Sequence, residues 1–127
     1  MSVESLPLAE LTKRVEQRDF DVAVVPLTVS YNSPAAVLGL FASDAQKNYA
    51  GYQNTGFDSR LSGAAEARNA QSMADSYAQA ERLLLADGAV IPMYYESTFY
   101  ARGKKVSGIL LSPFSGGIYF KNAKIQK

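Results

Sequence analysis

The first 25 residues constrain the fold most, because strand-like and helix-like patterns alternate within them. Residues 2–6 can form a short strand, and Pro7 suits the first turn of a helix, where a missing N–H costs nothing. An apolar stripe then predicts a helix of about ten residues, formed by Leu8, Leu11 and Val15. Residues 20–25 are almost continuously apolar, which is typical of a strand covered on both faces. The pattern predicts a compact βαβ unit with parallel strands and a right-handed crossover.

Local signals predict the remaining elements. Ser33 and Pro34 are an N-cap and a first helical residue, so a short helix is expected over residues 35–41. Residues 55–58 have capping-box spacing and predict a helix through about Arg68. A longer helix is expected over residues 71–86, with Gly88 as its left-handed C-cap. Extended segments are expected at residues 90–95, 99–102, 106–111 and 118–125, with a turn at 103–105.

Composition limits what the chain can be. It has 127 residues, 47% of them hydrophobic, which suffices for one core and is too little for two full lobes. A net charge of +1 gives no field that would favour nucleic acid or an anionic membrane. The chain has no cysteine and no histidine, so disulfides, thiol catalysis, the usual general base and the commonest metal ligand are excluded. No cofactor is expected. The N-terminus lacks the basic and apolar regions of an export signal.

The first candidate site follows the apolar segment at residues 20–25. Ligands of open parallel sheets lie outside the carboxyl ends of the strands. Ser30, Tyr31 and Asn32 would be delivered to that place, and their hydroxyl, phenol and amide groups can donate and accept hydrogen bonds. The alternative is purely structural, with Asn32 and Ser33 making the turn and capping the next helix.

A second aromatic and polar cluster lies in the loop over residues 43–56. It consists of Asn48, Tyr49, Gly51 and Tyr52. Tyrosine offers rigid contact area with a polar tip, which suits ligand recognition. A tyrosine-packed surface loop is the structural alternative.

Tyr94 and Tyr95 end the expected strand at residues 90–95. Alternation sends their side chains to opposite faces, so that one could face a cleft. Packing of both side chains in the core is the favoured alternative.

Candidates for catalysis are weak. Asp19 and Asp21 would lie on one side of an extended chain, but carboxylates at the start of a strand are far more often solvated. Without histidine or a convincing titratable pair, no enzymatic activity is expected.

Six ordered blocks of sequence carry a resemblance to a known family. They cover residues 20–23, 31–34, 48–52 with 57–58, 77–84, 90–95 and 119–123, and include Tyr-Asn-Ser-Pro, Asn-Tyr-Ala-Gly-Tyr and Val-Ile-Pro-Met-Tyr-Tyr. In order and spacing the chain resembles the late part of the family 5 extracellular solute-binding proteins of ABC importers, the oligopeptide- and dipeptide-binding type.

The resemblance implies an α/β fold, the C-terminal lobe of a type II periplasmic-binding-protein fold, with the short βαβ unit, helices and a mixed sheet. Residues 1–94 would belong to the ligand-binding lobe, and residues 95–127 would be a hinge and return segment toward the first lobe. The implied function is binding of a peptide or similar solute, without chemistry, by a periplasmic or extracellular, membrane-associated receptor. Its implied partners are the ABC permease and the remaining lobes of the parent protein. The implied contacts are Ser30, Tyr31, Asn32, Tyr49 and Tyr95.

Two departures from the family pattern concern the ligand. Peptide binders often have tryptophan and aspartate where this chain has Leu27 and Ser30, and that aspartate pairs with the amino terminus of the peptide. A buried ammonium without its counter-charge costs several kcal/mol. A free peptide amino terminus is therefore not expected to be anchored at Ser30.

Two other readings of the chain stay open. One is a free-standing α/β enzyme that uses carboxylates or tyrosines. The other is a module that forms homo-oligomers through unpaired strands, because exposed strand edges invite pairing. Met1 is interpreted as a start introduced by expression rather than a native one.

Overall fold

The computed structural model describes residues 3–95, 99–112 and 117–126. These residues fall into two compact units. The first unit contains the chain up to Val29 and from Ser33 to Ile91, and the second contains Ser30–Asn32 and the chain from Pro92 onward. All helices lie in the first unit and all described strands lie in the second.

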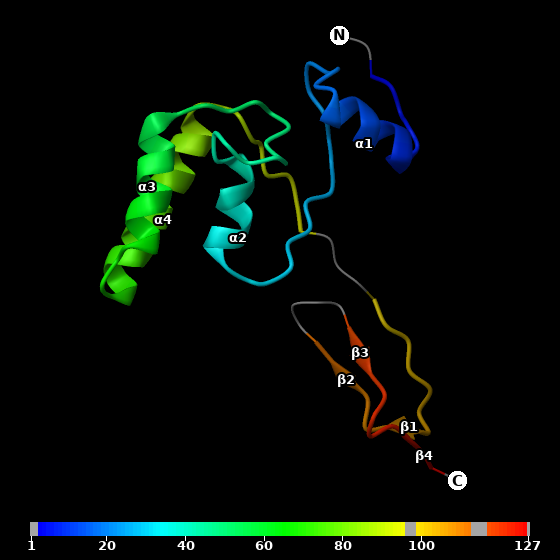
Figure 1. Ribbon diagram of the computed structural model, residues 1–127. Helices are drawn as coiled ribbons and strands as arrows, with labels where there is room; N and C mark the ends of the chain where they lie inside the picture. The colour runs from blue at the N-terminus through cyan, green and yellow to red at the C-terminus, as the bar shows by residue number, and fades with distance from the viewer. Residues whose placement is uncertain (1–2, 96–98, 113–116, 127) are drawn as a thin grey trace. The chain divides into compact units, whose positions relative to one another are not determined.

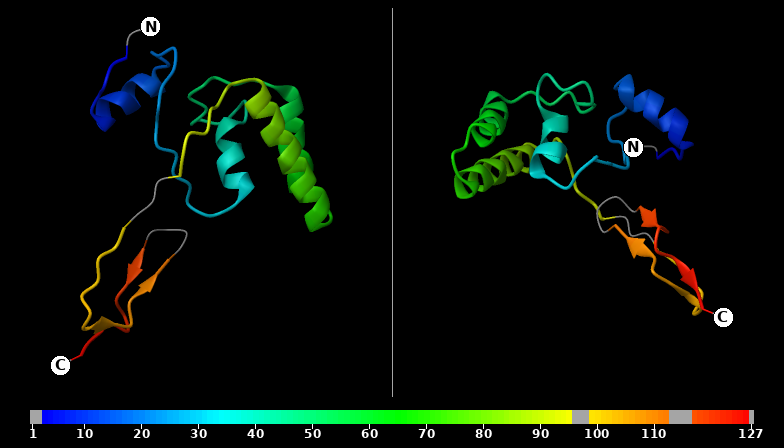
Figure 2. Two further views of the ribbon diagram at one scale, coloured as in Figure 1. Left: turned by 180° about the vertical axis from the view of Figure 1, so that it is seen from behind. Right: turned by 60° about the horizontal axis from the view of Figure 1, so that its bottom comes forward.

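The first unit is helical. Its elements are α1 (Leu8–Glu16), α2 (Pro34–Leu38), the 3-10 helix η1 (Gly39–Phe41), α3 (Thr55–Ala65) and α4 (Ala70–Ala86). Helices α3 and α4 form a hairpin and lie side by side in every view (Figure 1 and Figure 2). Helix α2 packs against α4. The predicted helices are thus confirmed, with bounds that shift by a few residues.

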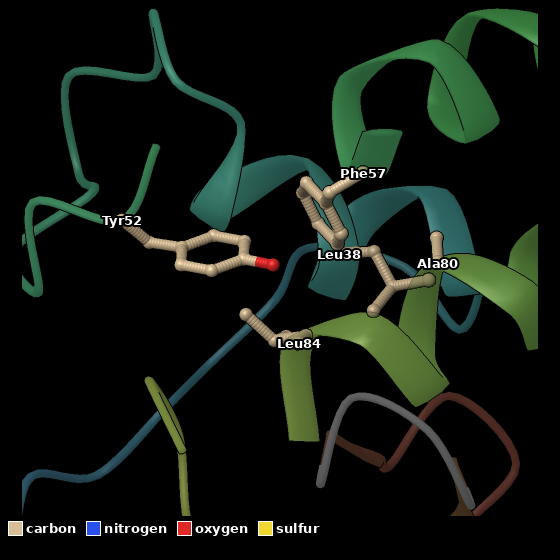
Figure 3. Packing of buried hydrophobic residues seen from close by; sticks show 5 residues of the cluster. All are labelled: Leu38, Tyr52, Phe57, Ala80 and Leu84. Atoms are coloured by element: carbon tan, nitrogen blue, oxygen red, sulfur yellow. The ribbon is translucent and has the colours of Figure 1, made fainter. Parts of the chain in front are cut away.

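The core of this unit forms where α2, α3, α4 and the loop before α3 meet (Figure 3). Its buried side chains are Leu38, Tyr52, Phe57, Ala80 and Leu84. Phe57 is fully buried. Its ring packs edge-to-face against the ring of Tyr52, with the ring centroids 5.3 Å apart. Edge-to-face aromatic pairs add stability beyond the area that they bury. The loop therefore contributes the Tyr52 side chain to the core.

Side-chain caps begin the α-helices α2, α3 and α4. The Ser33 hydroxyl accepts a hydrogen bond from the Ala35 N–H at 3.2 Å, as predicted for α2. Asn54 and Asn69 accept from the N–H groups of Phe57 and Ser72 in the same way. The cap of α3 is thus one residue earlier than the capping-box pattern indicated, because the Asn54 amide reaches the N–H of Phe57.

Left-handed residues follow two of the helices. Gly88 has φ +67° after α4, which confirms the predicted C-cap. Arg18 has φ +57° after α1, an uncommon conformation for a residue with a Cβ. The N–H of Asp19 donates to the Arg14 carbonyl and the N–H of Arg18 to the Val15 carbonyl. These two bonds form a Schellman motif that ends α1.

The predicted βαβ unit is wrong for the described residues. Residues 3–6 and 20–25 are not in strands, although α1 lies between them as expected. Val22 and Val24 are 66% and 61% exposed. A strand needs a neighbour for its backbone hydrogen bonds, and the described part of the first unit contains no other strand. The composition of residues 20–25 favours an extended strand, but a strand is stable only when a second strand pairs with it.

The second unit contains two antiparallel strand pairs instead of one mixed sheet. Its strands are β1 (Val106–Ser107), β2 (Leu110–Leu111), β3 (Ile118–Tyr119) and β4 (Lys124–Ile125). Strand β1 pairs with β4, with Val106 opposite Ile125, and β2 pairs with β3, with Leu110 opposite Tyr119. Strands were also predicted at residues 90–95 and 99–102, but neither segment is in a strand.

Gly108 allows the chain to pass from β1 to β2. It has φ +72°, and a Cβ there would overlap the carbonyl oxygen of Asn122. Only glycine fits this position, because any side chain would meet both the strained dihedral and the backbone of the facing segment.

Candidate functional site

The loop between η1 and α3 is built around Asn48, which is only 3% exposed. The Asn48 Nδ2 donates to the carbonyl oxygens of Ala42 at 3.1 Å and Tyr52 at 2.7 Å. Its Oδ1 accepts from the Tyr52 N–H at 3.0 Å. Both amide donors and the acceptor are therefore used, as a buried amide requires. The side chain holds the loop closed.

Arg18 joins the segment after α1 to the same loop. Its Nη2 donates to the Asn48 carbonyl oxygen at 3.3 Å. The guanidinium lies against Gly51, where a Cβ would come within 3.2 Å of the Arg18 Nη1. Gly51 also has φ +63°, so a side chain there would be strained, and the Arg18 guanidinium would have to shift slightly to make room for it.

Tyr52 anchors the loop to the end of α4. Its phenol donates to Asp87 Oδ2 at 2.7 Å, and the Asn54 Nδ2 donates to the same oxygen at 2.7 Å. Burial, followed by the hydrogen bond to Asp87 and the charge of that carboxylate, raises the pKa of Tyr52 to about 12. The same bonds from Tyr52 and Asn54 lower the pKa of Asp87. The network is thus most stable with a neutral phenol and an ionised carboxylate.

An open cavity of about 670 Å³ lies beside the start of α3. It is lined by Ser43, Gln53, Asn54, Thr55 and Asp58. The Asp58 carboxylate accepts from the Ser43 N–H at 3.1 Å and from its hydroxyl at 2.7 Å. The lining offers amide, hydroxyl and carboxylate groups suited to hydrogen bonding, and none of the sequence-predicted contacts belongs to it.

The structure distributes the predicted contacts over both units. Ser30, Tyr31 and Asn32 are exposed in a bend of the second unit, and Tyr31 is a large exposed side chain. Tyr49 is half-buried in the loop of the first unit. Tyr95 belongs to the second unit.

Tyr94 and Tyr95 are 79% and 100% exposed. The expectation that both pack in the core is wrong, and the reason is the same as for residues 20–25. The segment does not pair with a strand, so nothing directs either side chain inward.

Three polar residues of the loop network escaped sequence reasoning. Asn54, Asp58 and Asp87 lie at helix ends, where such residues are expected for capping alone. The spacing of Asp87, directly before Gly88, marked only a helix end. Its link to Tyr52 spans 35 residues, and no local pattern shows a contact of that range.

Features of other protein classes are not found in the described residues. No group of three or more acidic side chains there is arranged to hold a metal ion. Across residues 3–95, 99–112 and 117–126, each helix is too short or too polar to cross a lipid bilayer.

Comparison with known proteins gives consistent likenesses. The periplasmic oligopeptide-binding protein OppA of Salmonella typhimurium is 31% identical over 120 residues, covering 87% of this chain and 20% of that protein. OppA of Escherichia coli is 30% identical over 101 residues, covering 80% of this chain and 17% of that protein. No protein-family model matches the chain.

A solved structure shares the fold. The pheromone receptor PrgZ, described with its mode of peptide binding, superposes with a TM-score of 0.78 at 22% identity. The match covers 99% of this chain and 24% of that receptor.

The chain thus spans about a fifth of the length of the curated relatives that it matches. The similarity to each relative extends over most of the chain, so it is not limited to one short motif. Together with the six ordered sequence blocks, these likenesses support the resemblance of the chain to a fragment of the family 5 extracellular solute-binding proteins.

Proposed function

We propose that this chain is one part of a receptor that binds peptides and delivers them to an ABC permease. The observation that carries the proposal is the 31% identity to OppA of Salmonella typhimurium, which extends over 87% of the chain. Both curated relatives are named as oligopeptide-binding proteins. Their names also place them in the periplasm, which supports a periplasmic or extracellular location for this chain.

The mechanism would be capture between lobes. Residues 1–94 would form part of the ligand-binding lobe, and residues 95–127 would return through a hinge to the first lobe. The two compact units divide between Ile91 and Pro92, three residues before that boundary, which supports the division. A few residues at the end of an element are enough for a hinge. The chain would then need the remaining lobes to enclose a ligand.

Tyr31 and Asn32 are the first proposed ligand contacts, followed by Ser30, Tyr49 and Tyr95. Their exposure supports the assignment, because Ser30, Tyr31, Asn32 and Tyr95 keep polar groups accessible. Backbone groups of an extended peptide can pair with such segments, while its side chains enter hydrated pockets. Recognition of this kind favours many peptide sequences over one.

The chain would bind without chemistry. In the loop network, the two groups with shifted pKa values are Tyr52 and Asp87. The Tyr52 phenol keeps its proton and the Asp87 carboxylate is ionised, so this pair does not resemble a nucleophile with its general base. An enzyme acting through carboxylates or tyrosines therefore has less support than a binding protein.

A chimaeric receptor tests the proposal. This chain would replace the aligned region of the Salmonella typhimurium protein, and titration calorimetry would measure the binding of short peptides. We expect binding to survive, and to weaken about tenfold in the Tyr31→Ala variant, as the loss of one aromatic contact predicts. Tyr119→Ala is the matched control, because Tyr119 has similar exposure and is not a proposed contact. A folded chimaera that binds no peptide would refute the proposal.

Ser30 gives a second arm of the same experiment. Wild-type Ser30 lacks a charge for the peptide amino terminus, so free and N-acetylated peptides should bind with similar affinity. Ser30→Asp should create a preference for the free amino terminus of about tenfold or more. Strong wild-type discrimination against acetylated peptides would contradict this assignment of Ser30.

A further inference from the structure

Arg18 follows α1 in a backbone conformation that glycine adopts more easily. Its φ is +57°, and it occupies the position after α1 that Gly88 occupies after α4. A residue with a Cβ is strained in this region, and helix ends of this kind usually have glycine. Retained strain points to a task of the side chain, and the contacts of the Arg18 guanidinium show what that task is.

The guanidinium contacts both ends of a tight turn in the loop between η1 and α3. The turn runs from Asn48 to Gly51, and the Gly51 N–H donates to the Asn48 carbonyl oxygen at 3.1 Å. The Arg18 Nη2 donates to the same oxygen at 3.3 Å, and the guanidinium lies against Gly51. A charged donor makes such a hydrogen bond stronger than a neutral donor would.

Tyr49 lies inside this turn, between its two ends. Its N–H donates to the Lys47 carbonyl oxygen at 2.8 Å, and its side chain is half-buried. The buried Asn48 amide bonds to other backbone groups of the loop. Asn48 therefore holds the loop as a whole, whereas Arg18 acts on the two residues that delimit the turn around Tyr49.

We propose that Arg18 is a positioning residue for ligand binding, which holds the turn at residues 48–51 so that Tyr49 meets the peptide in one orientation. The inference rests on the proposed function, because it needs Tyr49 to be a ligand contact. A contact that is ordered before binding loses less conformational freedom when the ligand arrives, and affinity rises accordingly. Arg18 contributes in this way without touching the ligand.

A purely structural role would appear in the free energy of unfolding instead. Arg18 is exposed, and substitution of an exposed side chain usually changes that free energy little. Arg18→Gly makes the distinction sharp, because glycine removes the side chain and also relieves the strained dihedral. This variant should unfold at a temperature no lower than that of Arg18→Ala, and both variants should lose affinity equally.

The chimaeric receptor and titration calorimetry with short peptides measure the affinity. We expect Arg18→Ala and Arg18→Gly to weaken binding about fivefold, as the loss of one hydrogen bond predicts. Arg18→Lys keeps a charged donor for the Asn48 carbonyl and should recover part of the affinity. Lys13→Ala removes the same charge from an exposed position of α1, so it is the matched control and should bind like the wild type.

A double-mutant cycle with Tyr49 separates positioning from a general effect on the receptor. Tyr49→Ala removes the side chain that Arg18 positions, so the further loss from Arg18→Ala in that background should be less than about twofold. Equal losses in both backgrounds would overturn the proposal, because Arg18 would then act without Tyr49. Unchanged binding in Arg18→Ala or in Tyr49→Ala would overturn it as well.

Fluorine NMR gives a second readout, on the chain as it is and without a ligand. A fluorinated tyrosine replaces tyrosine throughout, and the Tyr49 resonance is identified by its absence in Tyr49→Phe. Arg18→Ala should shift or broaden this resonance and leave that of Tyr119, in the second unit, unchanged. Far-UV circular dichroism of each variant checks that the helices are intact.

The two readouts distinguish failure of this inference from failure of the proposed function. A wild-type chimaera that binds no peptide would refute the proposed function and, with it, any role of Arg18 in binding. Normal wild-type binding together with a Tyr49 resonance that does not respond to Arg18→Ala would refute the role of Arg18 alone.

Discussion

Asn48 is the polar side chain on which the loop between η1 and α3 depends. Its amide satisfies two carbonyl groups and one N–H of the loop, and the loop in turn places Tyr52 in the core. A buried hydrogen-bonding group that loses its partner costs far more than the bond contributes on average. The sequence showed Asn48 as part of a polar cluster, but it could not show that this amide is buried.

Replacement of Asn48 by alanine should destabilise the first unit by about 2–3 kcal/mol, because it leaves the N–H and the carbonyl of Tyr52 without partners. It also removes one of the two hydrogen bonds to the Ala42 carbonyl, which still accepts from the Ala45 N–H. Urea unfolding followed by far-UV circular dichroism measures the change. Gln53→Ala, at an exposed position of the same loop, is the control and should cost less than about 0.5 kcal/mol. Equal effects of the two variants would contradict the role of Asn48.

The Tyr52–Asp87 bond should make stability depend on pH at both ends of the range. Asp87 has a lowered pKa in the folded state, so its contribution is present above the ordinary carboxyl pKa of 3.8 and is lost as the pH falls through the folded value. Tyr52 has a raised pKa of about 12, so its contribution is present below the ordinary phenol pKa of 10.0 and is lost as the pH rises toward 12.

Unfolding free energies of the wild type and of Tyr52→Phe across this pH range measure the effect. In the variant, the loss of stability at acid pH should be smaller but still present, because Asn54 still donates to Asp87. The part of the alkaline loss of stability that comes from Tyr52 should disappear. Parallel curves for the two proteins would show that the bond does not contribute.

Helices α3 and α4 both start with an asparagine cap, but the loss of the two caps should reduce the stability of the fold by different amounts. The Asn69 side chain caps α4 alone, whereas Asn54 caps α3 and also donates to Asp87 at the end of α4. Asn69→Ala should cost about 1 kcal/mol, the usual value for a lost N-cap. Asn54→Ala should cost more, because it also removes a partner of Asp87. Thermal unfolding of both variants, with Arg68→Ala as an exposed control, makes the comparison; a smaller loss in Asn54→Ala would be evidence against the shared role.

The elements that sequence predicted correctly are those that local groups stabilise. Helices need caps and an apolar stripe within a few residues, and the signals at Ser33, Pro34 and Gly88 stand in the sequence itself. The strands expected at residues 20–25 and 90–95 needed a neighbouring strand, which sequence near them cannot supply. The contacts of Tyr52 with Asp87 and of Arg18 with Asn48 were out of reach for the same reason, since each joins residues 30 or more positions apart.

At the scale of the whole chain, the two units should differ strongly in stability. Every buried side chain of the described core lies in the first unit, and the described strands of the second unit are two residues long. Short strand pairs without a buried face are marginal in water. Amide hydrogen exchange should therefore show protection in α3 and α4 and rapid exchange in β2 and β3. Equal protection factors in the two units would mean that they unfold together.

Asp87 stands at the carboxyl end of α4, where the helix dipole disfavours negative charge. Tyr52 and Asn54 offset that penalty from outside the helix. At position 87, lysine should therefore be preferred in the isolated helix, and aspartate should be preferred in the intact chain. In an excised peptide of residues 69–88, lysine in place of Asp87 should increase helicity, whereas the same exchange in the intact chain should weaken the fold. At this position the contacts with Tyr52 and Asn54 thus contribute more to the fold than the stability of the isolated helix would.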